Sequence, residues 1–116
     1  MSDRETRPWG WFETIETGSN YKVKKLFVKA GCSISLQSHD HRDEHWVIVN
    51  GRGVFKQGYE NNPLIESFVE VGEYIFIPKL RKHRITASED LTLIEVQMGI
   101  CDEADIKRYQ DDYGRA

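Results

Sequence analysis

The chain has none of the features that mark membrane, secreted or repetitive proteins. Its 116 residues contain no internal repeat and no low-complexity segment. No apolar run approaches the roughly 18–20 residues of a membrane-spanning helix. The polar N-terminus, Met1 to Arg7, has no apolar stretch of the kind that a secretory signal needs. These absences predict a cytoplasmic protein with no membrane partner.

An excess of positive charge is also missing, and cysteine is scarce. The formal net charge is −3, from 16 basic and 19 acidic residues. A nucleic-acid partner is therefore not expected, because phosphate backbones attract basic surfaces. The two cysteines, Cys32 and Cys101, lie far apart and form no C-x-x-C pair. We expect them to be reduced structural thiols.

What the chain does contain is a series of short apolar runs separated by turn residues. The length suits one domain with one core, and 39% of the residues are hydrophobic. Turn signals such as Asn50-Gly51 separate the runs, which is typical of β-strands. The predicted strands cover residues 21–29, 33–39, 45–49, 54–57, 64–71, 74–77, 83–87 and 91–98. Strands at this spacing indicate an all-β sandwich or barrel.

The two ends of the chain have a different character. An N-terminal arm is expected at residues 1–20, a barrel at 21–98, and a helix and tail at 99–116. Asp102 is a good N-cap for a short helix from Glu103 to Tyr109. The arm is rich in aromatic residues and should lie over an apolar surface. A sugar could stack on Trp9, Trp11 and Trp46, although tryptophans more often make core or dimer contacts. We also expect the protein to form a homodimer.

A cluster of histidines suggests a metal site. Three of the four histidines, His39, His41 and His45, fall within seven positions, and Glu44 lies among them. Residues two apart on a strand face the same side, so Gln37 and His39 should project together. Far along the chain, His83 opens another apolar strand. A buried histidine or glutamate must be paired or bind a metal, because desolvating a lone charge is too costly.

The spacing of these residues resembles that of the cupins. The first cupin motif is Gly, five residues, His-x-His, four residues, Glu, six residues, Gly. The chain reproduces it with Gly31, Gln37, His39, Glu44 and Gly51, glutamine replacing the first histidine. The resemblance implies a single-domain double-stranded β-helix, or jelly-roll barrel.

The second cupin motif is Gly, five residues, Pro-x-Gly, two residues, His. The chain matches it with Gly72, Pro78 and His83, but Leu80 stands where the motif has its second glycine. The two motifs together imply one divalent metal ion held by Gln37, His39, Glu44 and His83.

His41 is an alternative ligand, because His39 and His41 also form a His-x-His pair. That pair would leave only two residues before Glu44 and would break the spacing from Gly31. His45 follows Glu44 directly, so on a strand it should face the other side and make hydrogen bonds at the surface or an interface. Mixed oxygen and nitrogen donors leave zinc, manganese, iron, cobalt and nickel as candidate metals.

Over nearly its whole length the chain resembles the type II phosphomannose isomerase domain. The matching segments are RPWG at 7–10, VKK at 23–25, SLQSHDHRDEHW at 35–46, IP at 77–78, HR at 83–84, IEVQ at 94–97 and DYGR at 112–115. In that family the domain is usually the C-terminal half of a bifunctional enzyme that also carries a sugar-nucleotide pyrophosphorylase. No such half is present in this sequence, so a separate mannose-nucleotide pyrophosphorylase is a candidate partner.

The resemblance implies interconversion of mannose 6-phosphate and fructose 6-phosphate. A sugar phosphate needs cations, and Arg42 lies between two ligand positions, near the expected barrel mouth. Lys24 and Arg115 are carried over from the family pattern as further phosphate ligands, and no catalytic base is assigned. Two other functions stay open: a non-catalytic cupin that binds a sugar or sugar nucleotide, and another cupin enzyme such as an epimerase or dioxygenase.

Overall fold

The computed structural model describes residues 4–59 and 61–115, and all regular structure in those ranges is β-strand. The strands are β1 (Arg4–Arg7), β2 (Gly10–Thr17), β3 (Tyr21–Val28), β4 (Leu36–Ser38), β5 (Arg42–Asn50), β6 (Arg52–Gly58), β7 (Ile65–Glu70), β8 (Tyr74–Ile77), β9 (Lys82–Ala87), β10 (Leu91–Gly99) and β11 (Lys107–Gln110). The predicted all-β fold is confirmed. No helix in the described ranges could cross a membrane.

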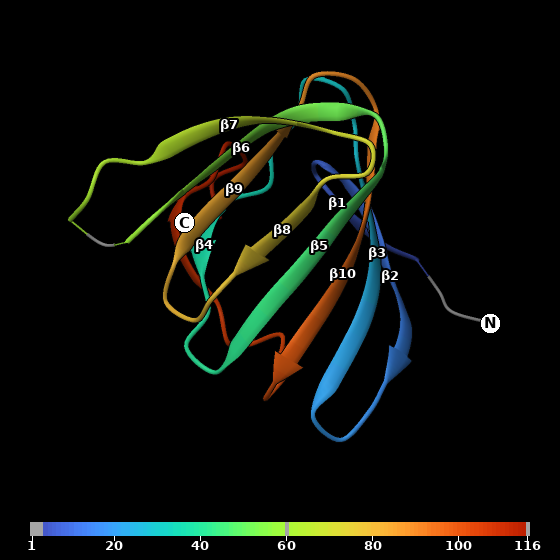
Figure 1. Cartoon of the computed structure of the whole chain (residues 1–116), viewed down its shortest axis with the longest axis vertical. Helices are drawn as coiled ribbons and strands as arrows, with labels where there is room; N and C mark the ends of the chain where they lie inside the picture. The colour runs from blue at the N-terminus through green and yellow to red at the C-terminus, as the bar shows by residue number, and fades with distance from the viewer. Residues whose placement is uncertain (1–3, 60, 116) are drawn as a thin grey trace.

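Two antiparallel sheets face each other across the core (Figure 1). One has six strands in the order β1-β2-β3-β10-β5-β8, and the other has five in the order β11-β4-β9-β6-β7. Neighbours in a sheet are often far apart in the sequence: β10 lies between β3 and β5, and β9 lies between β4 and β6. This crossing of the chain brings distant ligand positions to one place.

Strand β5 shows how the alternation of side chains builds the interior. Glu44, Trp46 and Ile48 are buried, whereas Val47 and Val49 on the opposite side of the strand are exposed. The deepest apolar residues come from both sheets and fill the space between them. They include Val28, Trp46, Ile48, Phe55, Ile77, Ile85, Leu91 and Leu93.

The N-terminal segment adds two strands to the larger sheet. Strand β1 pairs with β2, and β2 pairs with β3. Trp9 and Phe12 are buried in the core cluster, which confirms that this aromatic segment covers apolar surface. Trp11 faces the other side of β2 and stacks on Phe27, with ring centroids 5.6 Å apart.

The predicted C-terminal helix is wrong. Asp102 does start a turn, since its Oδ1 accepts a hydrogen bond from the Ala104 amide at 2.9 Å. The chain then extends and forms strand β11, which pairs with β4. An isolated helix of about seven residues is marginal in water. The free edge of β4 offers backbone partners that outweigh this weak local preference.

Two of the turns that have a left-handed residue lie at positions of the cupin motifs. The predicted turn at Asn50-Gly51 is confirmed, with Gly51 at φ 78° between β5 and β6. Leu80, at the second glycine position of the cupin motif, takes φ 72° despite its side chain. Its amide donates a hydrogen bond to the His39 carbonyl at 2.9 Å. The turn after β8 therefore holds the backbone of a candidate metal ligand.

Gly51 should be much less tolerant of alanine than Gly72, although both have positive φ. A Cβ at position 51 would lie 2.1 Å from the Asp90 carbonyl oxygen, whereas one at position 72 would meet no atom within 4 Å. Gly51→Ala should lower the free energy of unfolding by about 2–5 kcal/mol through backbone strain plus overpacking. Gly72→Ala should cost only about 1–2 kcal/mol. Urea denaturation measures both, and equal losses would contradict the steric argument.

Candidate metal centre and substrate pocket

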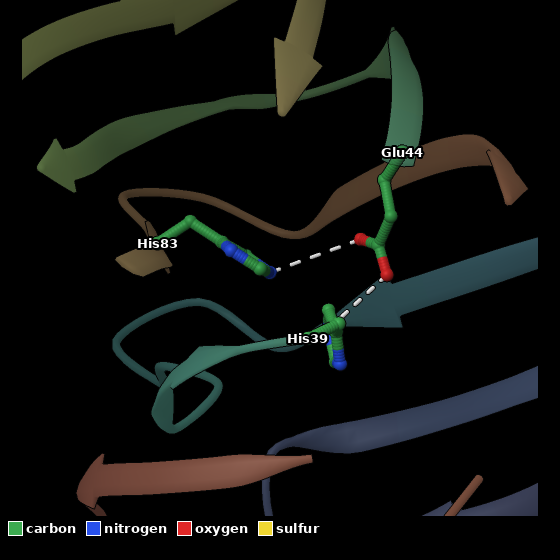
Figure 2. Close-up of side chains that lie close together, drawn as sticks. All are labelled: His39, Glu44 and His83. Carbon is green, nitrogen blue, oxygen red and sulfur yellow. Dashed lines mark ion pairs between the residues drawn. The ribbon is translucent and has the colours of Figure 1, made fainter. Parts of the chain in front are cut away.

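Three predicted ligands come together between the sheets. His39 follows β4, Glu44 lies on β5 and His83 lies on β9, and their ligand atoms all fall within 4.8 Å of one another. Glu44 Oε2 is 3.2 Å from His39 Nε2, and Glu44 Oε1 is 3.8 Å from His83 Nε2. Figure 2 shows the carboxylate of Glu44 facing both imidazole rings. We call these three residues the ligand cluster.

Backbone carbonyls hold the two imidazoles in one tautomer. His83 Nδ1 is 3.0 Å from the Arg81 carbonyl, and His39 Nδ1 is 2.6 Å from the Asp105 carbonyl. A carbonyl only accepts hydrogen bonds, so in each ring Nδ1 carries the proton and Nε2 presents a lone pair. Such a second partner on the far nitrogen is typical of histidines that bind metals.

Burial keeps both rings neutral. It lowers the pKa of His83 to about 3, with a further contribution from nearby His39. The pKa of His39 is also lowered, first by burial and then by the Arg42 guanidinium. Both Nε2 atoms therefore offer lone pairs at neutral pH, the form in which histidine coordinates metals.

The donor set fits a divalent metal ion. His83 Nε2 is buried and has no hydrogen-bond partner in the described ranges. Its lone pair faces Glu44 Oε1, an arrangement that is repulsive unless a cation lies between them, whereas the Arg42 guanidinium lies beside His39 Nε2 and Glu44 Oε2. Two imidazoles and one carboxylate form a common protein ligand set for metals with an open coordination position.

Gln37 and the alternative ligand His41 lie in surroundings that differ from each other. Gln37 is the register partner of His83 across β4 and β9, and its Oε1 accepts a hydrogen bond from the Ser35 hydroxyl at 2.8 Å. His41 is exposed, and its imidazole lies with Asp40 and Asp105 rather than with the ligand cluster. The role of Gln37 as the fourth ligand stays a prediction.

Arg42 lies against the ligand cluster instead of in an open loop. It is 5% exposed, because β5 begins at this residue and alternation turns Arg42 inward with Glu44. Its Nε donates to Glu44 Oε2 at 3.0 Å, and a second nitrogen lies 3.3 Å from His39 Nε2. Its third nitrogen donates to the Asp102 carbonyl at 3.1 Å. Arg42 therefore places a positive charge beside Glu44 and fixes the orientation of its carboxylate.

A second buried carboxyl group lies beside Glu44. The indole nitrogen of Trp46 donates to Glu44 Oε1 at 3.0 Å and to Glu95 Oε2 at 3.1 Å. Burial, followed by the nearby Glu44 charge, raises the pKa of Glu95 to about 8. Glu95 also accepts a hydrogen bond from Gln97 Nε2 at 2.7 Å, and Gln97 Oε1 is buried without a partner in the described ranges.

A pocket between the sheets reaches His39 of this cluster, and its lining has more basic than acidic residues. His39 and Gln37 line it together with five basic and two acidic residues, which are Arg7, Lys24, Arg42, Arg108, Arg115, Glu95 and Glu103. Lys24 is 4% exposed and forms an ion pair with Glu103. Arg115 donates two side-chain hydrogen bonds to Asp111, at 2.8 and 2.9 Å. All three predicted phosphate ligands therefore line one pocket, and their role stays a prediction.

The family described as mannose-6-phosphate isomerase C-terminal matches residues 1–111. The chain belongs to this family. Xanthan biosynthesis protein XanB of Xanthomonas campestris pv. campestris is 40% identical over 112 residues, which cover 94% of this chain and 23% of XanB. Mannose-1-phosphate guanylyltransferase ManC of Salmonella typhimurium is 39% identical over 112 residues, covering 94% of this chain and 22% of ManC. The isomerase-type domain thus spans less than a quarter of these relatives.

Solved structures show the same cupin fold. The capsular polysaccharide assembling protein CapF of Staphylococcus aureus superposes with a TM-score of 0.85 at 22% identity, covering 96% of this chain and 33% of that one. Oxalate decarboxylase OxdC of Bacillus subtilis gives a TM-score of 0.82 at 17% identity, over 92% of this chain and 30% of that one. The family match and the shared fold together confirm the cupin resemblance predicted from the motif spacing.

Sequence reasoning missed several residues that line this pocket. Glu95 and Gln97 were noted only as part of a family segment, although two polar residues at alternate positions of an apolar strand are a signal of an inward-facing polar site. Arg108 was assigned to a helix and Arg7 to the arm, so neither was placed at the pocket. Both lie on edge strands whose pairing depends on the tertiary fold.

Proposed function

We propose that this isomerase-type cupin domain binds a divalent metal ion and interconverts mannose 6-phosphate and fructose 6-phosphate. The observation that carries the proposal is the ligand cluster, with the unpartnered Nε2 of His83, at a pocket lined by five cations. Membership of the mannose-6-phosphate isomerase C-terminal family supports the same substrate. The excess of basic groups suits a phosphorylated sugar, because guanidinium and ammonium groups bind phosphate oxygens.

His39, Glu44 and His83 would hold the metal, with Gln37 as the proposed fourth ligand. Zinc, manganese, iron, cobalt and nickel all suit such mixed nitrogen and oxygen donors. When bound, the metal would supply Lewis acidity that polarises the carbonyl of the sugar. The carbonyl partners of His39 and His83 keep both rings in the ligating tautomer.

The reaction moves one proton between neighbouring carbons. In the aldose-to-ketose direction, C2 loses its proton and C1 gains one, while the oxygen on C1 gains a proton and the oxygen on C2 loses one. Arg42 would orient Glu44 and place a positive charge near the oxygen that becomes negative on the way. Lys24 and Arg115 would contribute positive potential for the phosphate group.

The lengths of the relatives suggest the partner. ManC is named a mannose-1-phosphate guanylyltransferase, and the matched segment covers only 22% of it. We propose that this domain works with a separate mannose-nucleotide pyrophosphorylase, and that it forms the homodimer expected of a small cupin. Co-purification with the pyrophosphorylase tests the proposed partner, and sedimentation analysis tests the homodimer.

A coupled assay tests the isomerase directly. The protein is stripped with a chelator, reloaded with each candidate metal, and assayed for fructose 6-phosphate formation from mannose 6-phosphate. We expect no turnover in the stripped protein and recovery with at least one metal. Binding of mannose 6-phosphate without turnover for every metal would reject the isomerase and favour a non-catalytic sugar-binding cupin. Oxygen consumption with iron would instead indicate a dioxygenase.

A further inference from the structure

Arg108 is a pocket cation that comes from the C-terminal strand. In the pairing of β11 with β4, Arg108 lies opposite Gln37. Partners in an antiparallel pair project to the same side of the sheet, so the side chains of Arg108 and Gln37 share one face. Both residues line the pocket that reaches His39. Arg108 is exposed, and it therefore lies toward the solvent end of that pocket.

Three other basic residues that line the pocket already have acidic partners. Lys24 pairs with Glu103, Arg42 donates to Glu44, and Arg115 donates to Asp111. By contrast, the side chain of Arg108 forms no hydrogen bond or close ion pair within residues 4–59 and 61–115, and its charge acts on the Asp111 carboxylate only more weakly than that of Arg115 does. Its guanidinium nitrogens are therefore available to a ligand, whereas the other cations mainly add positive potential.

Arg7 approaches the pocket from the opposite sheet. It ends strand β1, at one edge of the six-stranded sheet, whereas Arg108 is on β11 at an edge of the five-stranded sheet. Arg7 donates to the neighbouring Thr6 carbonyl at 2.9 Å and lies 3.7 Å from Glu5, so its guanidinium is only partly engaged. An anion in the pocket would thus have one arginine from each sheet.

We propose that Arg108 binds the phosphate group of the substrate by direct hydrogen bonds, with Arg7 assisting from the other sheet. This inference rests on the proposed function for the identity of the sugar, and it extends to inorganic phosphate as a simpler ligand. The planar guanidinium donates two parallel hydrogen bonds to phosphate oxygens, which a lysine cannot reproduce. A phosphate at the exposed end would direct the carbonyl end of the sugar toward the buried ligand cluster.

Substitution of Arg108 tests the proposal. Arg108→Gln should raise the KM for mannose 6-phosphate at least 10-fold while kcat changes less than 3-fold, since the group binds the substrate away from the reacting carbons. The inhibition constant of inorganic phosphate should rise by a similar factor, and Arg108→Lys should give intermediate values. Lys107→Gln is the matched control. This substitution removes one charge from the same strand, but Lys107 does not line the pocket. A KM within 2-fold of wild type in Arg108→Gln, or an equal rise in Lys107→Gln, would overturn it.

A binding measurement separates this inference from the proposed function. Calorimetric titration of the metal-loaded wild type, Arg108→Gln and Lys107→Gln with inorganic phosphate needs no turnover. Phosphate binding that weakens at least 10-fold in Arg108→Gln alone supports the phosphate site, even if the wild type fails the isomerase assay. Isomerase activity in a wild type whose phosphate affinity does not depend on Arg108 would reject the inference and leave the proposed function standing.

Discussion

Replacing His83 by glutamine should remove both the bound metal and the isomerase activity. His83 is fully buried, and its Nε2 has no protein partner in the described ranges apart from the facing Glu44 carboxylate. Glutamine keeps a polar side chain at position 83, but its amide group differs from the imidazole in length and orientation. We expect metal content to fall from about one ion per chain to below 0.1, as measured by plasma mass spectrometry. The kcat/KM should fall more than 100-fold, because changes to the outer shell alone typically cost about 10–100-fold.

The matched control is His45→Gln on β5, in the opposite sheet. His45 lies outside the ligand cluster, where its Nδ1 is 2.5 Å from the Tyr74 hydroxyl and its ring stacks on Tyr74. This variant should keep its metal and its kcat/KM within about 3-fold of wild type. The predicted surface hydrogen-bonding role of His45 agrees with this contact.

A second substitution distinguishes loss of a ligand from misfolding of the His83→Gln variant. Glu44→Gln is nearly isosteric and removes the carboxylate that faces both histidines. It should lose the metal as well, while circular dichroism reports a native β-sheet spectrum. Wild-type metal content in both folded variants would show that the ion binds elsewhere, for example near Asp40, His41 and Asp105.

Replacing Arg42 by methionine should destabilise the metal-free protein by about 3–5 kcal/mol, the usual cost of leaving a buried charge without its partner. Arg42 is 5% exposed, and its Nε donates to Glu44, which is 1% exposed. Methionine fills much of the same volume, so the loss would arise mainly from the unpaired carboxylate. Urea denaturation in the presence of a chelator measures the change in free energy of unfolding.

The same variant should lose less stability when metal is present. A divalent ion at the ligand cluster would place positive charge beside Glu44 in the native state, replacing part of what Arg42 supplies. Arg52→Met is the matched control, because Arg52 pairs with Glu89 at an exposed position, and such pairs are worth about 0–1 kcal/mol. Equal losses with and without metal in Arg42→Met would point to packing rather than charge.

Much of the ligand cluster could be predicted because its signals are local. Gln37 and His39 are two residues apart, and Glu44 begins an apolar strand, so alternation alone places them on inward faces. His83 follows a strand that ends before Pro78, at the spacing of the second cupin motif. Structure places His39, Glu44 and His83 together, and membership of the isomerase C-terminal family agrees with the motif spacing.

The C-terminal segment shows where local reasoning failed. Asp102 and the acidic residues after it resemble a helix start, and the structure keeps the turn but not the helix. The residues that follow pair with β4, where the Tyr109 hydroxyl lies 2.9 Å from the Ser38 hydroxyl. A free strand edge about seventy residues earlier in the chain cannot be seen in a local pattern.

The strand boundary near Arg42 was also misplaced. Arg42 was expected between two ligand positions near the barrel mouth, ahead of a strand over residues 45–49, but β5 begins at Arg42 itself. From that start, alternation turns Arg42 inward beside Glu44 and Trp46. A strand boundary placed three residues too late thus hid the contact between Arg42 and Glu44.

By itself the sequence determined the all-β cupin fold, the family and the likeness of His39, Glu44 and His83 to a metal site, because alternation and motif spacing are properties of short segments. Only the tertiary structure decided which charges meet. In the tertiary structure Arg42 donates a hydrogen bond to Glu44, and Glu95 lies beside the same carboxylate. Arg7 and Arg108 line one pocket from opposite sheets. Those contacts depend on which strands become neighbours, and that choice is made by burial of the whole core rather than by any one segment.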